Sequence, residues 1–126
     1  MRILLSWPRG SVTGTLADTP TAQRLLAALP VRGKAQCWGD EVYFHVPLEA
    51  RLEADACDVV PPGTLCYWVE GASLALPFGP TPVSRGDECR LVTRVNQLGR
   101  IDGDPRLLAS IAAGDTVEVT RLDGAG

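Results

Sequence analysis

Residues 68–84, WVEGASLALPFGPTPVS, decide the fold that this sequence predicts. With the residues just before them they hold two strand-like runs, 64–69 and 73–78, which are separated by a turn at 70–71. In the second run every other residue is large and apolar, so one face of this strand is expected to be buried. Pro77 lies inside that run, which indicates an edge, a bulge or the end of strand pairing.

A second block, residues 38–44 (WGDEVYF), is expected to be the partner of this stretch. Alternate residues of a strand point to opposite faces of a sheet, so the apolar side chains at 42, 44 and 46 should enter the core. The opposite face carries Glu41, Tyr43 and His45. His45 is the only histidine, and because the sequence pairs it with no serine or cysteine nucleophile, we expect it to face solvent.

Two short helices are predicted from their caps and spacing. Thr19 suits an N-cap and Pro20 the first helical position, and Pro30 ends this helix after a run of leucines at helical spacing. The second helix opens in the same way at Asp104 and closes before Gly114. Its apolar stripe is expected to consist of Leu107, Leu108, Ile111 and Ala112.

The remaining runs complete a mainly β chain. Further strands are predicted at residues 2–7, 11–17, 34–38, 90–96, 99–101 and 115–122. About eight short strands with one helix early and one late favour a closed eight-stranded antiparallel β-barrel whose two ends are covered. An open sandwich is the structural alternative. We expect one domain over residues 1–122 and a flexible tail at 123–126.

Composition excludes several classes of function. The net charge of −3 and the scattered arginines give no support to nucleic-acid binding. No apolar run reaches the ~18 residues of a membrane helix, and the N-terminus lacks the pattern of a signal peptide, so a cytoplasmic location is expected. The four cysteines form no C-x-x-C pair, so we expect inert thiols, no metal and no cofactor.

Five motifs resemble a small prokaryotic cyclophilin-like family of unassigned function, and we expect a bacterial source. They are DTPTA at 18–22, WGDEVYF at 38–44, YW at 67–68, FGPTP at 78–82 and VNxxGR at 95–100. The resemblance implies the cyclophilin-type eight-stranded β-barrel with two helices. True cyclophilins carry a Phe-x-x-x-Arg motif, and neither Phe44 nor Phe78 is followed by arginine at that spacing. Peptidyl-prolyl isomerase activity is therefore an expectation from the fold alone.

One candidate ligand site collects aromatic and polar residues. It consists of Trp38, Glu41, Tyr43, Trp68, Phe78, Arg90 and Asn96. Aromatic walls with a carboxylate, a cation and an amide are typical of small-molecule sites. Arg90 could bind a ligand carboxylate and Asn96 an amide, and burial could raise the pKa of Glu41. In the alternative interpretation the aromatic side chains fill the barrel and Arg90 pairs structurally with Glu41 or Asp87.

The sequence therefore predicts a domain that binds a small molecule or a short peptide in an aromatic cleft. The alternatives are a prolyl isomerase, or a protein-interaction module that uses a strand edge near Pro77. The expected state is a monomer or a homodimer, with no nucleic-acid or membrane partner.

Overall fold

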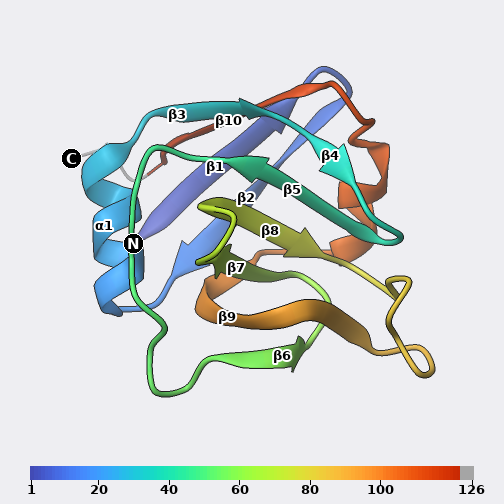
Figure 1. Cartoon of the computed structure of the whole chain (residues 1–126). Helices are drawn as coiled ribbons and strands as arrows, with labels where there is room; N and C mark the ends of the chain where they lie inside the picture. The colour runs from blue at the N-terminus through green and yellow to red at the C-terminus, as the bar shows by residue number, and fades with distance from the viewer. Residues whose placement is uncertain (123–126) are drawn as a thin grey trace.

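A computed structural model describes residues 1–122 as a strongly twisted, all but closed antiparallel barrel (Figure 1). Its strands are β1 (Arg2–Trp7), β2 (Gly10–Leu16), β3 (Val31–Lys34), β4 (Gln36–Cys37), β5 (Glu41–His45), β6 (Cys57–Val60), β7 (Thr64–Trp68), β8 (Ser73–Pro77), β9 (Cys89–Ile101) and β10 (Thr116–Arg121). The expected tail at 123–126 lies outside the described residues.

The barrel closes because one bent segment pairs at both ends of the sheet. The strand order is β3-β10-β1-β2-β9-β7-β8-β5-β4, and every pair is antiparallel. β3 and β4 follow each other in the chain with only Ala35 between them, and they pair with β10 and β5 respectively. The last strand of the order thus continues into the first, which confirms the barrel and not the sandwich.

Two of the expected strands turn out to be one. The runs at 90–96 and 99–101 form the single 13-residue strand β9, which changes partners along its length. Its first half pairs with β6, and its second half pairs with β7 and β2. β6 is an additional strand that was not predicted, since it is only four residues long and includes the charged Asp58.

The block at residues 38–44 pairs with the stretch at residues 68–84, as predicted. β5 lies beside β8, with Glu41 opposite Pro77 and Tyr43 opposite Ala75. β8 also pairs with β7, so it is an interior strand. The interaction hypothesis that relied on a free edge near Pro77 is therefore wrong, because Pro77 marks the end of a strand that has neighbours on both sides.

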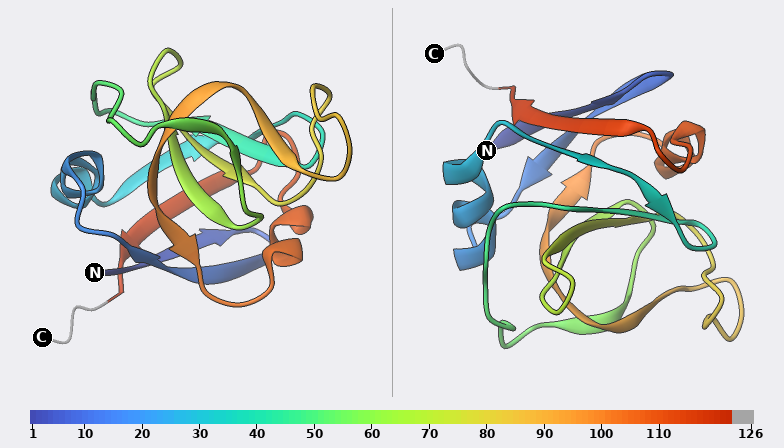
Figure 2. Two further views of the ribbon diagram at one scale, coloured as in Figure 1. Left: turned by 90° about the horizontal axis from the view of Figure 1, so that it is seen from below. Right: turned by 45° about the horizontal axis from the view of Figure 1, so that its top comes forward.

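The helices lie at opposite ends of the barrel (Figure 2). α1 (Pro20–Ala28) begins as predicted, since the Thr19 side chain accepts a hydrogen bond from the Ala22 N–H. η1 (Pro105–Ser110) is a 3₁₀ helix with Asp104 as its cap. With three residues per turn, only Leu108 and Ile111 share the buried face, so the expectation that Leu107 and Ala112 are buried is wrong. Within residues 1–122 no helix is long and apolar enough to span a membrane.

The apolar side chains form two separate clusters. The larger one fills the barrel and includes Phe44, Leu76 and Leu98, as the alternation along the strands predicts. The smaller one contains Cys66, Ala75, Leu91 and Val95. Because the side chains of a strand alternate between faces, this second cluster lies on the outer face of β5, β8 and β7, where β6 and the first half of β9 cover it.

Candidate functional site

A cleft opens beside the second cluster, between the outer face of β5, β7 and β8 and the first half of β9. Its volume is about 240 Å³. Eight residues line it, namely Trp38, Glu41, Tyr43, Trp68, Ala75, Leu91, Val92 and Val95. Four of the seven residues that the sequence singled out, Trp38, Glu41, Tyr43 and Trp68, therefore meet at one place.

A short turn holds Trp38 and Glu41 in position. The Trp38 N–H donates to the Glu41 carbonyl at 2.9 Å, which closes the turn, and Gly39 takes the left-handed backbone conformation within it (φ +60°). The Asp40 N–H donates to the Pro80 carbonyl at 2.8 Å. The proline-containing loop after β8 thus supports the end of β5 from which Glu41 projects.

Tyr43 and Trp68 form the aromatic corner of the cleft. Their ring centroids are 6.0 Å apart and their planes are nearly perpendicular, at 88°. This edge-to-face arrangement is favourable for aromatic rings. Both side chains pack against the second cluster and not inside the barrel, so the interpretation that they fill the barrel does not hold.

Glu41 is buried in apolar surroundings. Only 7% of its surface is exposed, and its Oε1 atom has no hydrogen-bond partner among the described residues. Burial raises the pKa of Glu41 from 4.5 to about 7, because removal from water disfavours the charged form. The indole N–H of Trp68 is also buried, and within residues 1–122 nothing accepts its hydrogen bond. Two residues that line the cleft thus each carry a buried polar atom without a protein partner among the described residues.

The other three candidate residues lie elsewhere. Phe78 packs against the cluster inside the barrel. Arg90 pairs with Glu88 at 3.0 Å and with Asp58 at 3.7 Å, and not with Glu41 or Asp87. The fully buried Asn96 is a structural residue. Its side chain accepts from the Glu53 N–H and donates to Thr21 Oγ1 and the Arg51 carbonyl.

Sequence analysis missed the wall that β9 contributes. Leu91, Val92 and Val95 line the cleft, and Val92 is 61% exposed at its mouth. Their run was recognised as a strand, but no local pattern tells which other strand it crosses. An exposed valine next to tryptophans becomes informative only when the fold brings them together.

Comparisons with known proteins agree with this architecture. A family model described as Cyclophilin-like matches residues 1–120. The chain belongs to the cyclophilin-like family. The solution structure of a hypothetical protein from Archaeoglobus fulgidus is similar to this cyclophilin-like chain, with 31% identity and a TM-score of 0.81 over 97% of this chain and 95% of that one.

A second solved structure is more distant. McbB in complex with tryptophan is 20% identical to this cyclophilin-like chain, with a TM-score of 0.65 over 98% of this chain and 46% of McbB. The cyclophilin-like chain therefore spans about half the length of McbB, and the likeness shows the fold alone. A comparison with curated proteins finds no match.

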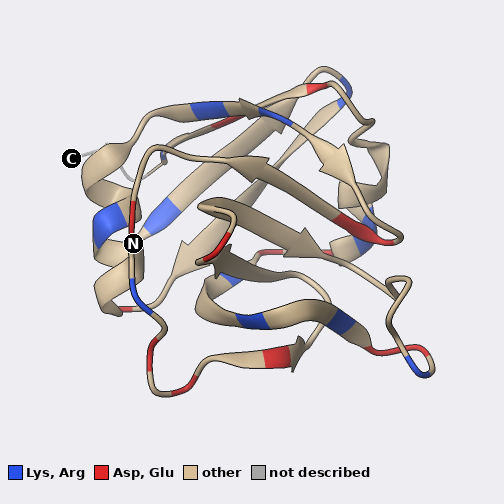
Figure 3. Ribbon diagram, in the orientation of Figure 1, with Lys and Arg blue, Asp and Glu red and all other residues tan. Residues whose placement is uncertain are grey.

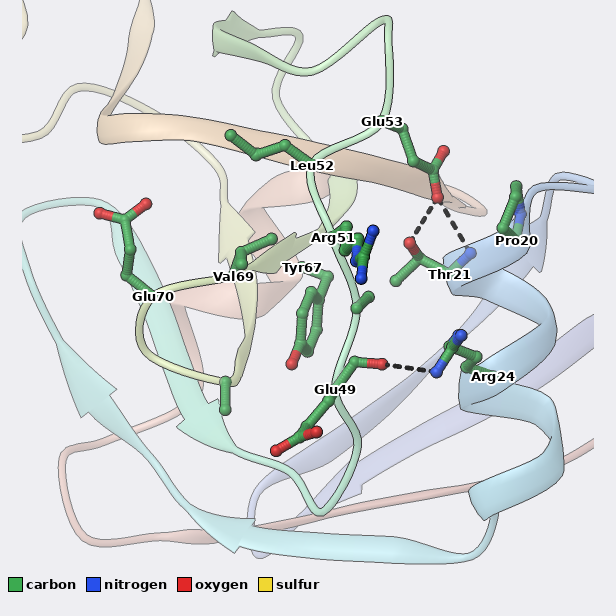
Figure 4. Close-up of a pocket in the computed structure, with 12 residues that line it drawn as sticks. Pro20, Thr21, Arg24, Glu49, Arg51, Leu52, Glu53, Tyr67, Val69 and Glu70 are labelled. Atoms are coloured by element: carbon green, nitrogen blue, oxygen red, sulfur yellow. Dashed lines mark hydrogen bonds between the residues drawn. The ribbon is translucent and has the colours of Figure 1, made fainter.

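This cyclophilin-like barrel has a second and larger hollow, of about 730 Å³, between α1 and the segment before β6 (Figure 4). Thr21 donates to the Glu53 carboxylate through both its N–H and its hydroxyl group, and Arg24 donates to the Glu49 carbonyl. These polar groups already have partners in the protein. The hollow is therefore a weaker candidate for a site than the aromatic cleft.

The cysteines beside the cleft are poor nucleophiles. Cys66 and Cys89 are buried free thiols. Burial, Glu41 and two neighbouring thiols raise the pKa of Cys66, and burial with three nearby carboxylates raises the pKa of Cys89 to about 11. A thiolate is the reactive form of cysteine. We therefore assign neither thiol a chemical role.

Gly71 offers a test of how the Trp68 ring is held. A Cβ atom at Gly71 would lie 2.2 Å from Trp68 Cε3, so Gly71→Ala should push the indole out of place. We expect the free energy of unfolding to fall by roughly 1–3 kcal/mol, as for other overpacked sites, and the near-ultraviolet circular dichroism of the aromatic rings to change. Gly86→Ala is the matched control, because its Cβ would make only an ordinary contact at 3.5 Å. Equal effects of the two substitutions would contradict this packing.

Proposed function

We propose that this cyclophilin-like domain binds a small organic molecule, or one side chain of a short peptide, in the aromatic cleft. The observation that carries the proposal is the pair of buried polar atoms without protein partners, Glu41 Oε1 and Trp68 Nε1. Buried polar groups in proteins are nearly always hydrogen-bonded, so two unpartnered atoms on residues that line one apolar cleft favour a bound ligand as their partner. A ligand with one hydrogen-bond donor and one acceptor would satisfy both.

The size and lining of the cleft limit the ligand. Its volume of about 240 Å³ lies below the roughly 300–1,000 Å³ of drug-sized pockets. We therefore expect a ligand of one or two rings. Apolar contacts with Leu91, Val92 and Val95 would supply most of the affinity, and the two polar atoms would orient the ligand. McbB, about half of which has a similar fold, has a structure in complex with tryptophan, a molecule of this size class.

Only family membership supports prolyl isomerisation as a function of this protein. The barrier to rotation about a peptide bond is about 18–20 kcal/mol, and an isomerase needs a donor placed at the prolyl nitrogen to lower it. Among residues 1–122 no arginine lines the cleft, and Arg90 is already engaged by two carboxylates. A cytoplasmic location, a bacterial source and a monomeric or homodimeric state stay predictions.

A screen with neutral one- and two-ring compounds, together with tryptophan, tests the proposal. We expect at least one compound to raise the melting temperature and to bind by isothermal titration calorimetry. Val92→Ser should weaken that binding roughly three- to tenfold, since apolar contact at the mouth of the cleft is lost. Val83→Ser is the matched control, because Val83 is also an exposed valine but does not line the cleft. No binding at millimolar concentration, or equal losses in both variants, would overturn the proposal.

A further inference from the structure

The Glu41 carboxylate has no cationic partner within the part of the chain that the structure describes. The ion pairs of residues 1–122 join Arg2 to Asp102, Arg32 to Glu118, Arg90 to Asp58 and Glu88, and Arg106 to Asp104. None of them includes Glu41. An ionised carboxylate in apolar surroundings is costly unless an opposite charge compensates it. The described part of the protein therefore supplies no cation that compensates the charge of the Glu41 carboxylate.

The charges around the cleft are negative. Cys89 lies close enough to Asp40, Glu41 and Glu88 that, after its burial, these three carboxylates are what raises the pKa of its thiol. Glu88 is neutralised by the nearby Arg90, so Asp40 and Glu41 are the carboxylates there that no ion pair within residues 1–122 compensates. Acidic segments at the start of β5 and just before β9 are visible in red in Figure 3. The resulting local field favours a positively charged ligand and disfavours an anionic one.

The aromatic walls favour the same sign of charge. The face of an aromatic ring is electronegative and attracts organic cations, and clusters of aromatic side chains are a recurring site for ammonium groups. Trp38, Tyr43 and Trp68 supply three such rings in one cleft, and two of them stand perpendicular to each other. The carboxylate and the rings thus point to one ligand chemistry.

We propose that the ligand is an organic ammonium compound, held by Glu41 as its counter-ion against the rings of Trp38, Tyr43 and Trp68. This inference rests on the proposed function and narrows it to a class of ligand. The buried indole N–H of Trp68 has no partner among the described residues, so the ligand should also carry a hydrogen-bond acceptor. Because the field is negative, a neutral acceptor such as a hydroxyl or carbonyl oxygen suits the cleft better than a carboxylate.

Three compounds that share the indole ring and differ in charge test the proposed class of ligand. Tryptamine is cationic, indole-3-ethanol is its neutral analogue and indole-3-acetate is anionic. At about pH 8, above the pKa of Glu41, calorimetry should show tryptamine binding about tenfold more tightly than indole-3-ethanol, and indole-3-acetate binding most weakly. Glu41→Gln should abolish the preference for tryptamine and leave the affinity for indole-3-ethanol within about twofold. Glu49→Gln, at the second hollow, should change neither.

The outcomes separate this inference from the proposed function. If tryptamine and indole-3-ethanol bind equally and Val92→Ser weakens both, the ammonium class is overturned and the proposed cleft stands. A preference for tryptamine that persists in Glu41→Gln also overturns the inference, because the cation would then bind elsewhere. If no member of the series binds, the inference falls, and the screen of neutral compounds decides the proposed function separately.

Discussion

Replacing Glu41 with glutamine should raise the free energy of unfolding by about 2–3 kcal/mol at pH 8 and change it little at pH 4. Glutamine keeps the shape of the side chain and removes only the charge. Burial holds the pKa of Glu41 at about 7 in the folded protein, against 4.5 for an ordinary glutamate. The folded state therefore keeps a proton that the unfolded state has lost between these two pH values.

The sign of the pH dependence follows from this difference. The folded state binds more protons than the unfolded state from about pH 4.5 to 7, so the wild-type protein loses stability as the pH rises through this window. Below pH 4.5 both states are neutral at Glu41, and above pH 7 both are charged, so the difference between the two proteins is constant outside the window. Contact with water at the cleft reduces the effect below the full value of the shift.

Urea denaturation of both proteins at pH 4, 6 and 8 measures the difference. Glu88, Asp102 and Asp104 have lowered pKa values, so their stabilising contribution is lost as the pH falls, but they are common to both proteins and their effects cancel. Glu49→Gln is the matched control, because it makes the same substitution at an exposed position. A gain for Glu41→Gln that is the same at all three pH values would show that the carboxylate is not desolvated.

Asn96→Ala should lower the free energy of unfolding by roughly 3 kcal/mol or more and the melting temperature by on the order of 10 °C. Asn96 is fully buried, and its side chain makes three hydrogen bonds that tie α1 and the segment before β6 to β9. Truncation leaves the Glu53 N–H and the Arg51 carbonyl without these partners. Each buried group left unpaired costs about 1–3 kcal/mol.

Thermal and urea unfolding provide the measurement, with Gln97→Ala as the matched control. The neighbouring Gln97 is half-buried and makes a single long bond, 3.3 Å to the Asp55 carbonyl, so its removal should cost under about 1 kcal/mol. Because Asn96 does not line the aromatic cleft, the folded Asn96→Ala protein should bind cleft ligands as the wild type does. A loss of ligand affinity without a loss of stability would contradict this and indicate that Asn96 contributes to ligand binding.

Much of the fold could be predicted because the signals are local. The alternation at Val42, Phe44 and Val46 correctly assigned the buried face of β5. Thr19 caps α1 as its position before Pro20 predicts. The predictions were wrong where residues distant in the chain determine which strands pair. The 13-residue strand β9 changes partners midway, and the four-residue strand β6 exists only because β9 lies beside it.

The residues of the candidate site also separate into those that local sequence could predict and those that depend on the fold. Glu41 and Tyr43 share a face of one strand, so the sequence could place them together. Asn96 resembled a ligand-binding amide, but the fold surrounds it with three protein partners. Leu91 and Val95 went unnoticed, although they form one wall of the cleft. Nothing in a strand's own residues says which surface it will cover.

The sequence by itself determined which side chains face each way, where the helices begin, and to which family of barrels the motifs point. These properties follow from backbone geometry over a few residues. Only the tertiary structure decided that the outer face of β5, β7 and β8 is covered by β9, that Glu41 therefore loses its water, and that the aromatic side chains line a cleft. Desolvation depends on what packs over a residue, and residues distant in the chain supply that cover.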